Sequence, residues 1–429
     1  MRSRNQSSNV LRVLMASVII LGAAVYACAA TEQVIYPFSF FSGGGAVSPG
    51  PLVFDRAGNL YGSAGGGGIG FGAIFELSPS PLGGWTMTIL HDFSGNAADG
   101  GNGDGAEPSA LIFDAAGNLY GVTAAGGGSG CGGPGCGVIF ELSPTSSGWM
   151  ETILYTFTGG GDGGSPDAIT MDVKGNLYGV TYRGGSASNY CNHGCGTVFR
   201  LARTSSSWSF RVLHTFTGAK DGGPPVGLAI HSGVLYGATQ FGGNSSCVSG
   251  FASSGCGTVF TITPTTGGGA KFGIIHTFSG GSDGDVPDGG LIFDRAGNAY
   301  GATGGGGSSN AGVVFKLEPG STGWTETILH NFGGGSDGFS ALGALTLDKA
   351  GNIYGTTALG SSEYDDGIVF ELLPQSNGSW TEAILYTFTG LLDGQNPSSG
   401  VIFDTKGNLY GSTSAGGSGY GGIVYEITP

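Results

Sequence analysis

The sequence predicts an all-β fold, a seven-bladed β-propeller of four-stranded blades, and three observations support this prediction. First, a motif typified by residues 111–121 returns seven times in the 429-residue chain. A repeat period of this size indicates an array of one supersecondary unit. Second, each unit contains four strand-like runs. Third, a lone run near the N-terminus can complete the last unit. The tyrosines that mark the copies are Tyr61, Tyr120, Tyr178, Tyr236, Tyr300, Tyr354 and Tyr410.

The second copy shows the four expected strands in order. Residues 110–113 are a short apolar run, and the turn at 114–117 places glycine where positive φ is favoured. Residues 118–123 form the second expected strand, and a glycine-rich loop follows. The third and fourth expected strands are residues 137–142 and 149–157. Short β-rich runs bounded by Gly, Pro and Asp are typical strand signals.

Aromatic residues recur at equivalent places in the third and fourth strands. We expect them to pack between neighbouring units. In the fourth copy, which lacks a tryptophan, we expect Phe272 to take its place. The third-strand aromatics are Phe75, Phe140, Phe199, Phe260, Phe315, Phe370 and Tyr425, and the fourth-strand tryptophans are Trp85, Trp149, Trp208, Trp324 and Trp380.

The count of strands predicts how the ring closes. Seven first, second and third strands occur, but only six fourth strands follow a third strand. The missing strand stands at the front, where residues 34–40 resemble residues 153–157. An N-terminal strand that completes the last sheet leaves no open edge, and seven blades lie within the usual range for propellers.

The repeated motif resembles the bacterial GloVer tandem repeat. It reads Asp-x-x-Gly-Asn-Leu-Tyr-Gly-x-Thr, then a Gly-Gly loop, then Gly-x-Val-Phe-Glu-Leu, and it covers residues 34–429. The stretch 108–120 also resembles the more generic NHL propeller repeat. The resemblance implies an exported protein and no particular activity. The fourth copy departs from the pattern, because residues 230–235 lack the Asp and Asn.

The N-terminus has the pattern of a secretory signal peptide. Three arginines precede an apolar run at residues 13–25, which is short for a membrane span. We expect a signal peptide over residues 1–30, with cleavage near Ala29 or Ala30. Lipid attachment at Cys28 is the less favoured alternative, since Tyr26 fits a lipobox poorly.

The predicted mature chain, residues 31–429, forms one propeller domain and is strongly acidic. The full chain has 15 basic and 30 acidic side chains, and three of the basic ones lie in the signal segment, so the mature net charge is −18. Such a surface disfavours nucleic acid. No later stretch is apolar enough to cross a bilayer, and we expect a monomer.

Six cysteines form three local pairs, which in an exported chain predict disulfides. The rival interpretation is a zinc site around residues 191–195, but no second Cys/His cluster matches it. Of the six histidines, only His193 in that loop is a candidate ligand. The expected disulfide pairs are Cys131 with Cys136, Cys191 with Cys195, and Cys247 with Cys256.

Two sets of aspartates recur. One set precedes glycine in the fourth-to-first connections, on the face that also carries the cysteine loops. These carboxylates are candidate Ca²⁺ ligands, and the alternative is favoured turn chemistry. They are Asp104, Asp162, Asp221, Asp283, Asp337 and Asp393. The second set lies in the turn of the motif, where each Asp is expected to cap its own turn. These are Asp55, Asp114, Asp172, Asp294, Asp348 and Asp404.

One position on the fourth strand alternates between histidine and tyrosine, which predicts a half-buried packing role with a polar tip. Its occupants are Tyr36, His91, Tyr155, His214, His276, His330 and Tyr386.

No catalytic residue is predicted. The sequence lacks the known catalytic motifs in their required context, and the first strands read as near-uniformly apolar. We therefore expect a non-enzymatic binding or surface module that recognises a protein or glycan through its acidic, glycine-rich face. The alternative is a Ca²⁺-type hydrolase or lyase with its site at the channel mouth, resembling lactonase-type propellers.

Overall fold

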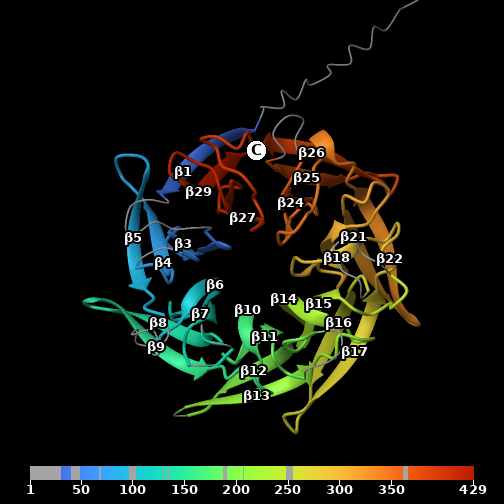
Figure 1. Ribbon diagram of the computed structural model, residues 1–429. Coiled ribbons are helices and arrows are strands. Elements are labelled where there is room, and N and C mark those ends of the chain that lie inside the picture. The colour runs from blue at the N-terminus through green and yellow to red at the C-terminus, as the bar shows by residue number, and fades with distance from the viewer. Residues whose placement is uncertain are drawn as a thin grey trace, which may run out of the picture.

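Seven four-stranded antiparallel sheets stand around a central axis in the computed structural model, which confirms the seven-bladed propeller (Figure 1). The described part of the chain contains no helix long and apolar enough to span a membrane. The predicted signal peptide lies outside the described residues except for Ala30. The described residues are 30–39, 49–66, 69–95, 103–128, 130–131, 133, 135–186, 191–205, 207–247, 255–360 and 366–429.

Blades are numbered along the chain, each from its innermost to its outermost strand. Blade 1 consists of β2 (Val53–Phe54), β3 (Leu60–Ala64), β4 (Ala73–Pro79) and β5 (Trp85–Asp92). Blade 2 consists of β6 (Ala106–Phe113), β7 (Leu119–Ala125), β8 (Val138–Thr145) and β9 (Gly148–Thr156). Blade 3 consists of β10 (Gly164–Met171), β11 (Leu177–Arg183), β12 (Thr197–Arg203) and β13 (Trp208–Thr215). Blade 4 consists of β14 (Gly223–His231), β15 (Val234–Phe241), β16 (Thr258–Pro264) and β17 (Ala270–Thr277).

The remaining blades, like blade 1, have innermost strands of two or three residues. Blade 5 consists of β18 (Asp285–Pro287) and β19 (Ile292–Phe293), which both pair with β20 (Ala299–Gly305), then β21 (Val313–Gly320) and β22 (Gly323–Asn331). A 3-10 turn, η2 (Gly335–Asp337), follows. Blade 6 consists of β23 (Thr346–Leu347), β24 (Ile353–Thr357), β25 (Ile368–Pro374) and β26 (Trp380–Thr387). Blade 7 consists of β27 (Val401–Phe403), β28 (Leu409–Thr413), β29 (Tyr420–Thr428) and β1 (Thr31–Ser39).

The first strand of the described chain closes the ring, as predicted. β1 pairs antiparallel with β29, with Thr31 opposite Thr428 and Val34 opposite Tyr425. The strand begins three residues before the expected start at residue 34. Both ends of the propeller therefore meet in blade 7 (Figure 1), and β1 pairs with the outer side of β29.

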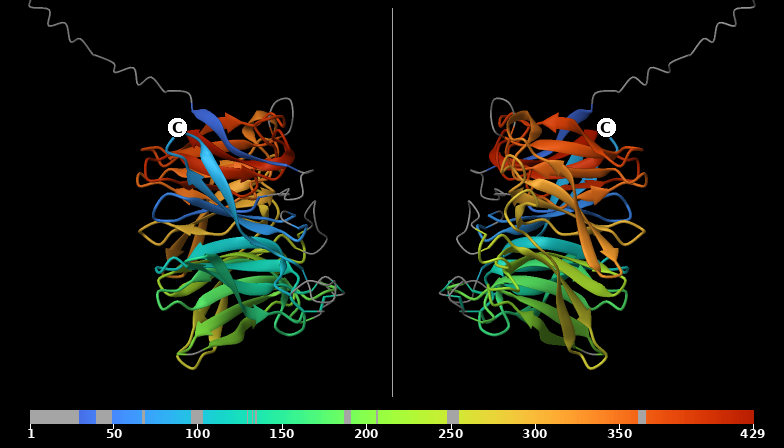
Figure 2. Two further views of the ribbon diagram at one scale, coloured as in Figure 1. Left: turned by 90° about the vertical axis from the view of Figure 1, so that its left-hand side faces the viewer. Right: turned by 90° about the vertical axis from the view of Figure 1, so that its right-hand side faces the viewer.

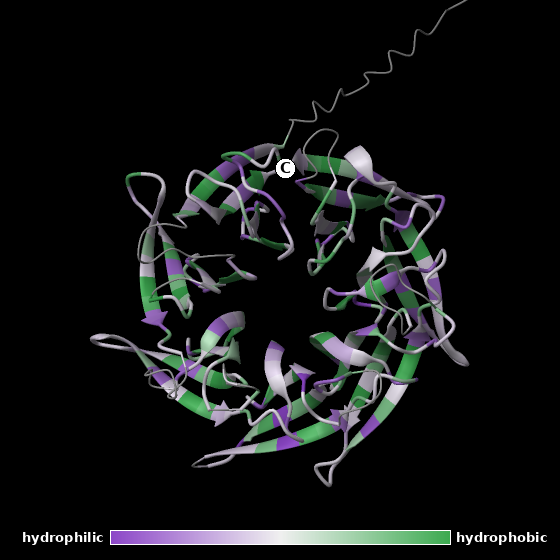
Figure 3. Ribbon diagram, in the orientation of Figure 1, coloured by the Kyte–Doolittle hydropathy of each residue, from purple (hydrophilic) through white to green (hydrophobic). Residues whose placement is uncertain are grey.

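The connections between strands divide between two faces of the ring (Figure 2). Because neighbouring strands are antiparallel, the second-to-third and fourth-to-first connections share one face, which we call the loop face. The expected layout is confirmed: first strands such as β6 and β10 lie innermost, and fourth strands such as β9 and β13 lie outermost. Hydrophobic residues are concentrated in the strands, and the loops are more polar (Figure 3).

Close approach of a glycine and an aromatic ring explains the Tyr-Gly pair in each motif. Gly121 lies under Phe140, and a Cβ at this glycine would come within 2.4 Å of the ring. Phe140 is fully buried beside Leu111 in the core between blades 1 and 2. The repeated third-strand aromatics thus pack inside and between blades, as predicted, because only glycine leaves room for them.

The aspartate of the motif caps its own turn, as predicted. Oδ1 of Asp114 accepts hydrogen bonds from the backbone N–H groups of Ala116 (2.8 Å) and Asn118 (2.9 Å), and the Asn118 amide donates to Oδ2 (2.9 Å). The Tyr120 hydroxyl reaches the same carboxylate at 3.4 Å, and Gly117 has a φ of 91°. The Asp, Gly, Asn and Tyr of the motif therefore form one hydrogen-bonded turn.

The expectation for Phe272 was wrong. Ala270 pairs with Pro264, which is the register that Trp149 has with Pro144 in blade 2. Ala270 therefore takes the place of the tryptophan, and Phe272 lies two residues further along the strand. A residue two positions further along a strand lies on the same face of the sheet but about 6.6 Å away. Phe272 therefore stacks on His214 and does not fill the place of the tryptophan.

Candidate functional site

Three disulfides on the loop face confirm the predicted pairing of the cysteines. The Cα atoms of the pairs are 5.3, 5.2 and 5.8 Å apart, inside the normal range for disulfides. Each bond closes a second-to-third connection, and these connections belong to blades 2, 3 and 4. The bonded pairs are Cys131–Cys136, Cys191–Cys195 and Cys247–Cys256.

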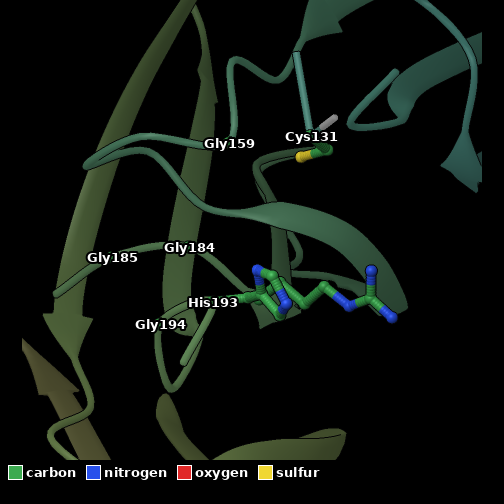
Figure 4. A pocket seen from close by; sticks show the side chains of 7 residues that line it. Cys131, Gly159, Gly184, Gly185, His193 and Gly194 are labelled. Atoms are coloured by element: carbon green, nitrogen blue, oxygen red, sulfur yellow. The ribbon is translucent and has the colours of Figure 1, made fainter. Parts of the chain in front are cut away.

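A hollow of about 340 Å³ lies on the loop face between blades 2 and 3. His193 and Arg183 line it together with Cys131 and several glycines. Figure 4 shows the His193 ring in this hollow, near Gly184 and Gly194. The backbone N–H of Gly184 donates a hydrogen bond to the carbonyl of His193 at 2.8 Å. The polar groups with which the hollow could bind a ligand are therefore chiefly the side chains of His193 and Arg183.

The six aspartates of the fourth-to-first connections each cap their own loop. The hydroxyl or backbone N–H of the residue that begins the loop donates to the carboxylate; in blade 6, Thr389 donates to Asp393 through both groups, at 2.7 and 2.9 Å. The Asp393 carboxylate also accepts from the Tyr386 hydroxyl on the outermost strand, at 3.0 Å. Because they lie beside the outermost strands, these six candidate residues are spread along the rim and are not gathered at the channel mouth.

At three junctions between blades, one of these aspartates meets a histidine and a glutamate. The histidine comes from the outermost strand of the same blade, and the glutamate comes from the outermost strand of the next blade. We call these groups the acid–histidine clusters. Within each one, one donor atom per residue lies within 4.8 Å of the others. The clusters are His91, Asp104 and Glu151; His276, Asp283 and Glu326; and His330, Asp337 and Glu382.

The histidine and carboxylate atoms of each cluster are close, but their separations of 3.3 to 3.9 Å are longer than ordinary hydrogen bonds. In the first cluster, His91 Nε2 lies 3.5 Å from Asp104 Oδ2 and 3.4 Å from Glu151 Oε2. His91 Nε2 and Glu151 Oε1 are buried and have no hydrogen-bond partner within the described part of the chain. Burial, followed by repulsion from Asp104, raises the pKa of Glu151 to about 8, and burial lowers the pKa of His91.

The histidines pack half-buried, as predicted: the His91 side chain is 20% exposed and meets the Phe93 ring edge-on at 4.7 Å. What sequence reasoning missed is the glutamate. Glu151 stands two residues after Trp149, opposite Leu142, and the same spacing recurs at Glu326 and Glu382. This position could have been noted from the repeat, but its contact with the preceding blade could not.

A second polar group lies in the channel at the loop face, and the expectation of near-uniformly apolar first strands missed it. Asp167 lies on β10 of blade 3, and Asp288 lies between β18 and β19 of blade 5. From blade 4, the Gln240 amide donates a hydrogen bond to Asp288 Oδ1. Blade 4 stands between the blades that carry the two carboxylates, so the carboxylates face each other past the channel side of blade 4.

The Asp288 carboxylate influences the Asp167 carboxylate across the channel wall. Although the Asp167 residue is exposed to solvent, the protein atoms crowded around it desolvate the carboxyl and, with repulsion from Asp288, raise its pKa to about 6. Burial also raises the pKa of the partly exposed Asp288, against the opposing effect of the Gln240 hydrogen bond. Tyr182 at the end of β11 stands near both, and burial and then Asp288 raise its pKa. This channel group, Asp167, Tyr182, Gln240 and Asp288, breaks the symmetry of the repeats over blades 3 to 5.

Comparisons with known proteins identify a repeat family and a fold. The family model described as the Gloeobacter/Verrucomicrobia repeat matches residues 86–251 and 246–429. A comparison with curated proteins gives no significant match.

Many solved structures are similar in fold. One is described as the extracellular domain of a one-component system from B. thetaiotaomicron, with a TM-score of 0.53 and 12% identity over 92% of this chain and 39% of the other. Another is described as a 6-phosphogluconolactonase from Bacteroides uniformis, with a TM-score of 0.49 and 14% identity over 79% of this chain and 84% of the other. At such identities the likeness concerns the fold alone.

Proposed function

The chain belongs to the Gloeobacter/Verrucomicrobia repeat family, and we propose that this member is an exported, non-enzymatic propeller that binds a glycan at the channel mouth of its loop face. In this proposal residues 1–30 are a signal peptide and residues 31–429 form one propeller domain. Three disulfides are compatible with export.

The channel group is the observation that carries this proposal. It combines two carboxylates, an amide and an aromatic ring that come from three consecutive blades and stand at one mouth. Ligand sites are concave and hold a small number of well-placed polar groups. Carboxylate and amide oxygens accept hydrogen bonds from sugar hydroxyls, and the Tyr182 ring offers an apolar surface. The repeats do not require these residue types, since Leu342 and Val226 occupy the positions equivalent to the aspartates in blades 6 and 4.

Charge decides which glycans are expected. The mature chain carries a net charge of −18, and two of its carboxylates, Asp167 and Asp288, stand at the site itself. Like charges repel across such a mouth. We therefore expect neutral or amino sugars to bind, and uronic acids or sulfated sugars to be excluded.

A panel of neutral, amino and uronic-acid oligosaccharides tests the proposal by direct binding measurements. Asp288→Asn and Gln240→Ala should weaken binding of the best neutral glycan at least tenfold. The first removes the negative charge of a hydrogen-bond acceptor and the second removes an amide, and we expect each change to cost about 1–2 kcal/mol. Asp162→Asn on the rim of blade 2 is the matched control and should leave the affinity unchanged. Equal affinity in all variants, or preference for acidic sugars, would contradict the proposal.

The second candidate is a metal-dependent hydrolase or lyase, and the coupling of the channel carboxylates favours it. A carboxylic acid with a pKa of about 6, as at Asp167, suits proton transfer near neutral pH, and carboxylates are ligands for Ca²⁺. Turnover of lactone or glycoside substrates that depends on added Ca²⁺ and is lost in Asp167→Asn would favour this candidate. Binding without turnover would favour the first.

A further inference from the structure

We propose that the three acid–histidine clusters are metal sites, each of which binds one divalent transition-metal ion such as Zn²⁺ and thereby links two neighbouring blades. Each site would use one imidazole nitrogen and two carboxylates. The sites lie at the outer junctions of blades 1 and 2, 4 and 5, and 5 and 6, away from the channel group. This inference is independent of the proposed function.

The spacing of the donor atoms supports a small ion. Zn²⁺ binds imidazole nitrogen and carboxylate oxygen at about 2.0–2.2 Å, and two such ligands in a tetrahedral site are about 3.4 Å apart. The histidine Nε2 atoms of the three clusters lie 3.3 to 3.9 Å from their carboxylate oxygens. These separations are long for direct hydrogen bonds. Four of the six are close to the edge of a tetrahedral site, and the other two are longer, at 3.9 and 3.7 Å.

The missing hydrogen bonds point to the same conclusion. Nε2 of all three histidines, and one oxygen of each cluster glutamate, are buried without a hydrogen-bond partner in the described residues. Buried polar atoms are rarely left without a partner. When both are ionised, two carboxylates carry two negative charges, which a divalent cation would neutralise in a site where burial makes unpaired charge costly.

Asp104 is already positioned for this role by its loop. In the first cluster, the hydroxyl and N–H of Ser94 both donate to Asp104 Oδ1, at 2.9 and 3.0 Å. These bonds leave Oδ2 directed at the histidine. Hydrogen bonds to the second oxygen of a ligating carboxylate orient it toward a metal.

The other junctions show what the repeat looks like without such a site. At the junction of blades 3 and 4, His214 Nε2 lies 3.3 Å from Asp221, but the next blade supplies Phe272, whose ring stacks on the imidazole at 3.9 Å. At the junction of blades 2 and 3, Tyr155 stacks on Phe210 in the same way. Glutamate therefore appears opposite a histidine in three places, where it completes a donor set, and apolar rings fill the place at these two junctions.

The donor set distinguishes these sites from the Ca²⁺ site that the aspartates first suggested. Ca²⁺ takes six to eight oxygen ligands, whereas each cluster supplies two carboxylates and one nitrogen. Imidazole with carboxylate suits Zn²⁺ and its first-row neighbours. The remaining coordination position would be filled by water or by the second carboxylate oxygen.

Metal stoichiometry of the full exported chain tests the proposal. The purified protein is stripped with a chelator, dialysed against Zn²⁺, and its metal content and melting temperature are measured. We expect about three Zn²⁺ per chain and a higher melting temperature with Zn²⁺ than with chelator, because the ion binds only the folded state. Glu151→Gln, Glu326→Gln and Glu382→Gln should each remove one equivalent.

Less than one bound Zn²⁺ per chain, or the same Zn²⁺ content in the wild type and in the triple Glu→Gln variant, would overturn the proposal. The excess negative charge of each cluster would then be compensated by a proton.

A variant that creates a fourth site provides an independent test. Phe272→Glu places a carboxylate opposite His214 and Asp221 and should raise the content from three to four. Phe210→Glu is its control, since the facing residue is Tyr155, and should add none. Circular dichroism confirms that each variant is folded.

Discussion

The junction between blades 1 and 2 and the junction between blades 2 and 3 occupy equivalent places in the ring, but different interactions stabilise them. The first brings His91, Asp104 and Glu151 together, where His91 Nε2 and Glu151 Oε1 have no hydrogen-bond partner among the described residues. The second stacks Tyr155 on Phe210, with ring centroids 3.9 Å apart and planes inclined by 7°. One backbone register thus supports either a polar cluster or an apolar stack.

The comparison teaches that the outer junction is the variable layer of this propeller. Deep packing is the same at both junctions, because Phe140 and Phe199 are fully buried in equivalent places. The residues farther out along the fourth strands differ. A stack stabilises by burying apolar area with no need for a ligand, whereas a polar cluster needs a cation or a proton to compensate its charge.

Removing the stack should have the largest effect. Phe210→Ala deletes the ring that contacts Tyr155, Phe157 and Phe199. We expect a loss of about 3 kcal/mol in the free energy of unfolding, at the low end for Phe→Ala because Phe210 is only partly buried. Denaturant unfolding measures it, and chelator should leave the loss unchanged. A loss below 1 kcal/mol would mean that the apolar junction is not held by this stack.

At the junction between blades 6 and 7, a glutamate meets an aspartate with a tyrosine in the place of the histidine. Glu32 on β1 meets Asp393 and Tyr386 there, and burial, followed by repulsion from Asp393, raises the pKa of Glu32 to about 7 from 4.5. A raised pKa means that the folded state holds the proton more tightly, so this contribution to stability is complete below pH 4.5 and is lost as pH rises through 7.

Glu32→Gln should therefore flatten the decline in stability between pH 4.5 and 7. Above pH 7 the variant should be more stable than the wild type by about 1 kcal/mol, a value reduced for partial exposure to solvent. Melting curves across pH 4 to 8 measure this difference. Identical pH profiles for the two proteins would show that the Glu32 carboxyl does not respond to its burial.

Removing the single hydroxyl of Tyr155 should have the smallest effect on the free energy of unfolding. Tyr155→Phe keeps the stack on Phe210 and removes the hydrogen bond from the Tyr155 hydroxyl to Asp162 Oδ2, which is 3.1 Å long. The Asp162 carboxylate keeps its bonds from Thr158, so we expect a loss of about 0.5 kcal/mol. Matched denaturant curves are the measurement, and a loss as large as that of Phe210→Ala would place the energy of this junction in the hydrogen bond.

Much of the fold could be predicted because its signals are local and repeated seven times. The turn of residues 114–117 was predicted from Asp114 and Gly117, whose roles depend only on neighbours within the same turn. Closure by the first strand was predicted from the count of strands. The prediction for Phe272 failed, since the residue that replaces a tryptophan is decided by register against β16 and not by aromatic character.

The sequence by itself determined the repeat, the strands, the closure of the ring, the disulfide pairs and the capped turns, because each depends on residues that are near in the chain or recur at a fixed period. Only the tertiary structure decided that Glu151 meets His91 and that Asp288 influences Asp167. The outermost strands of adjacent blades share no hydrogen-bond ladder. Their relative position is set by side-chain packing between sheets and by ring curvature, which no local pattern encodes.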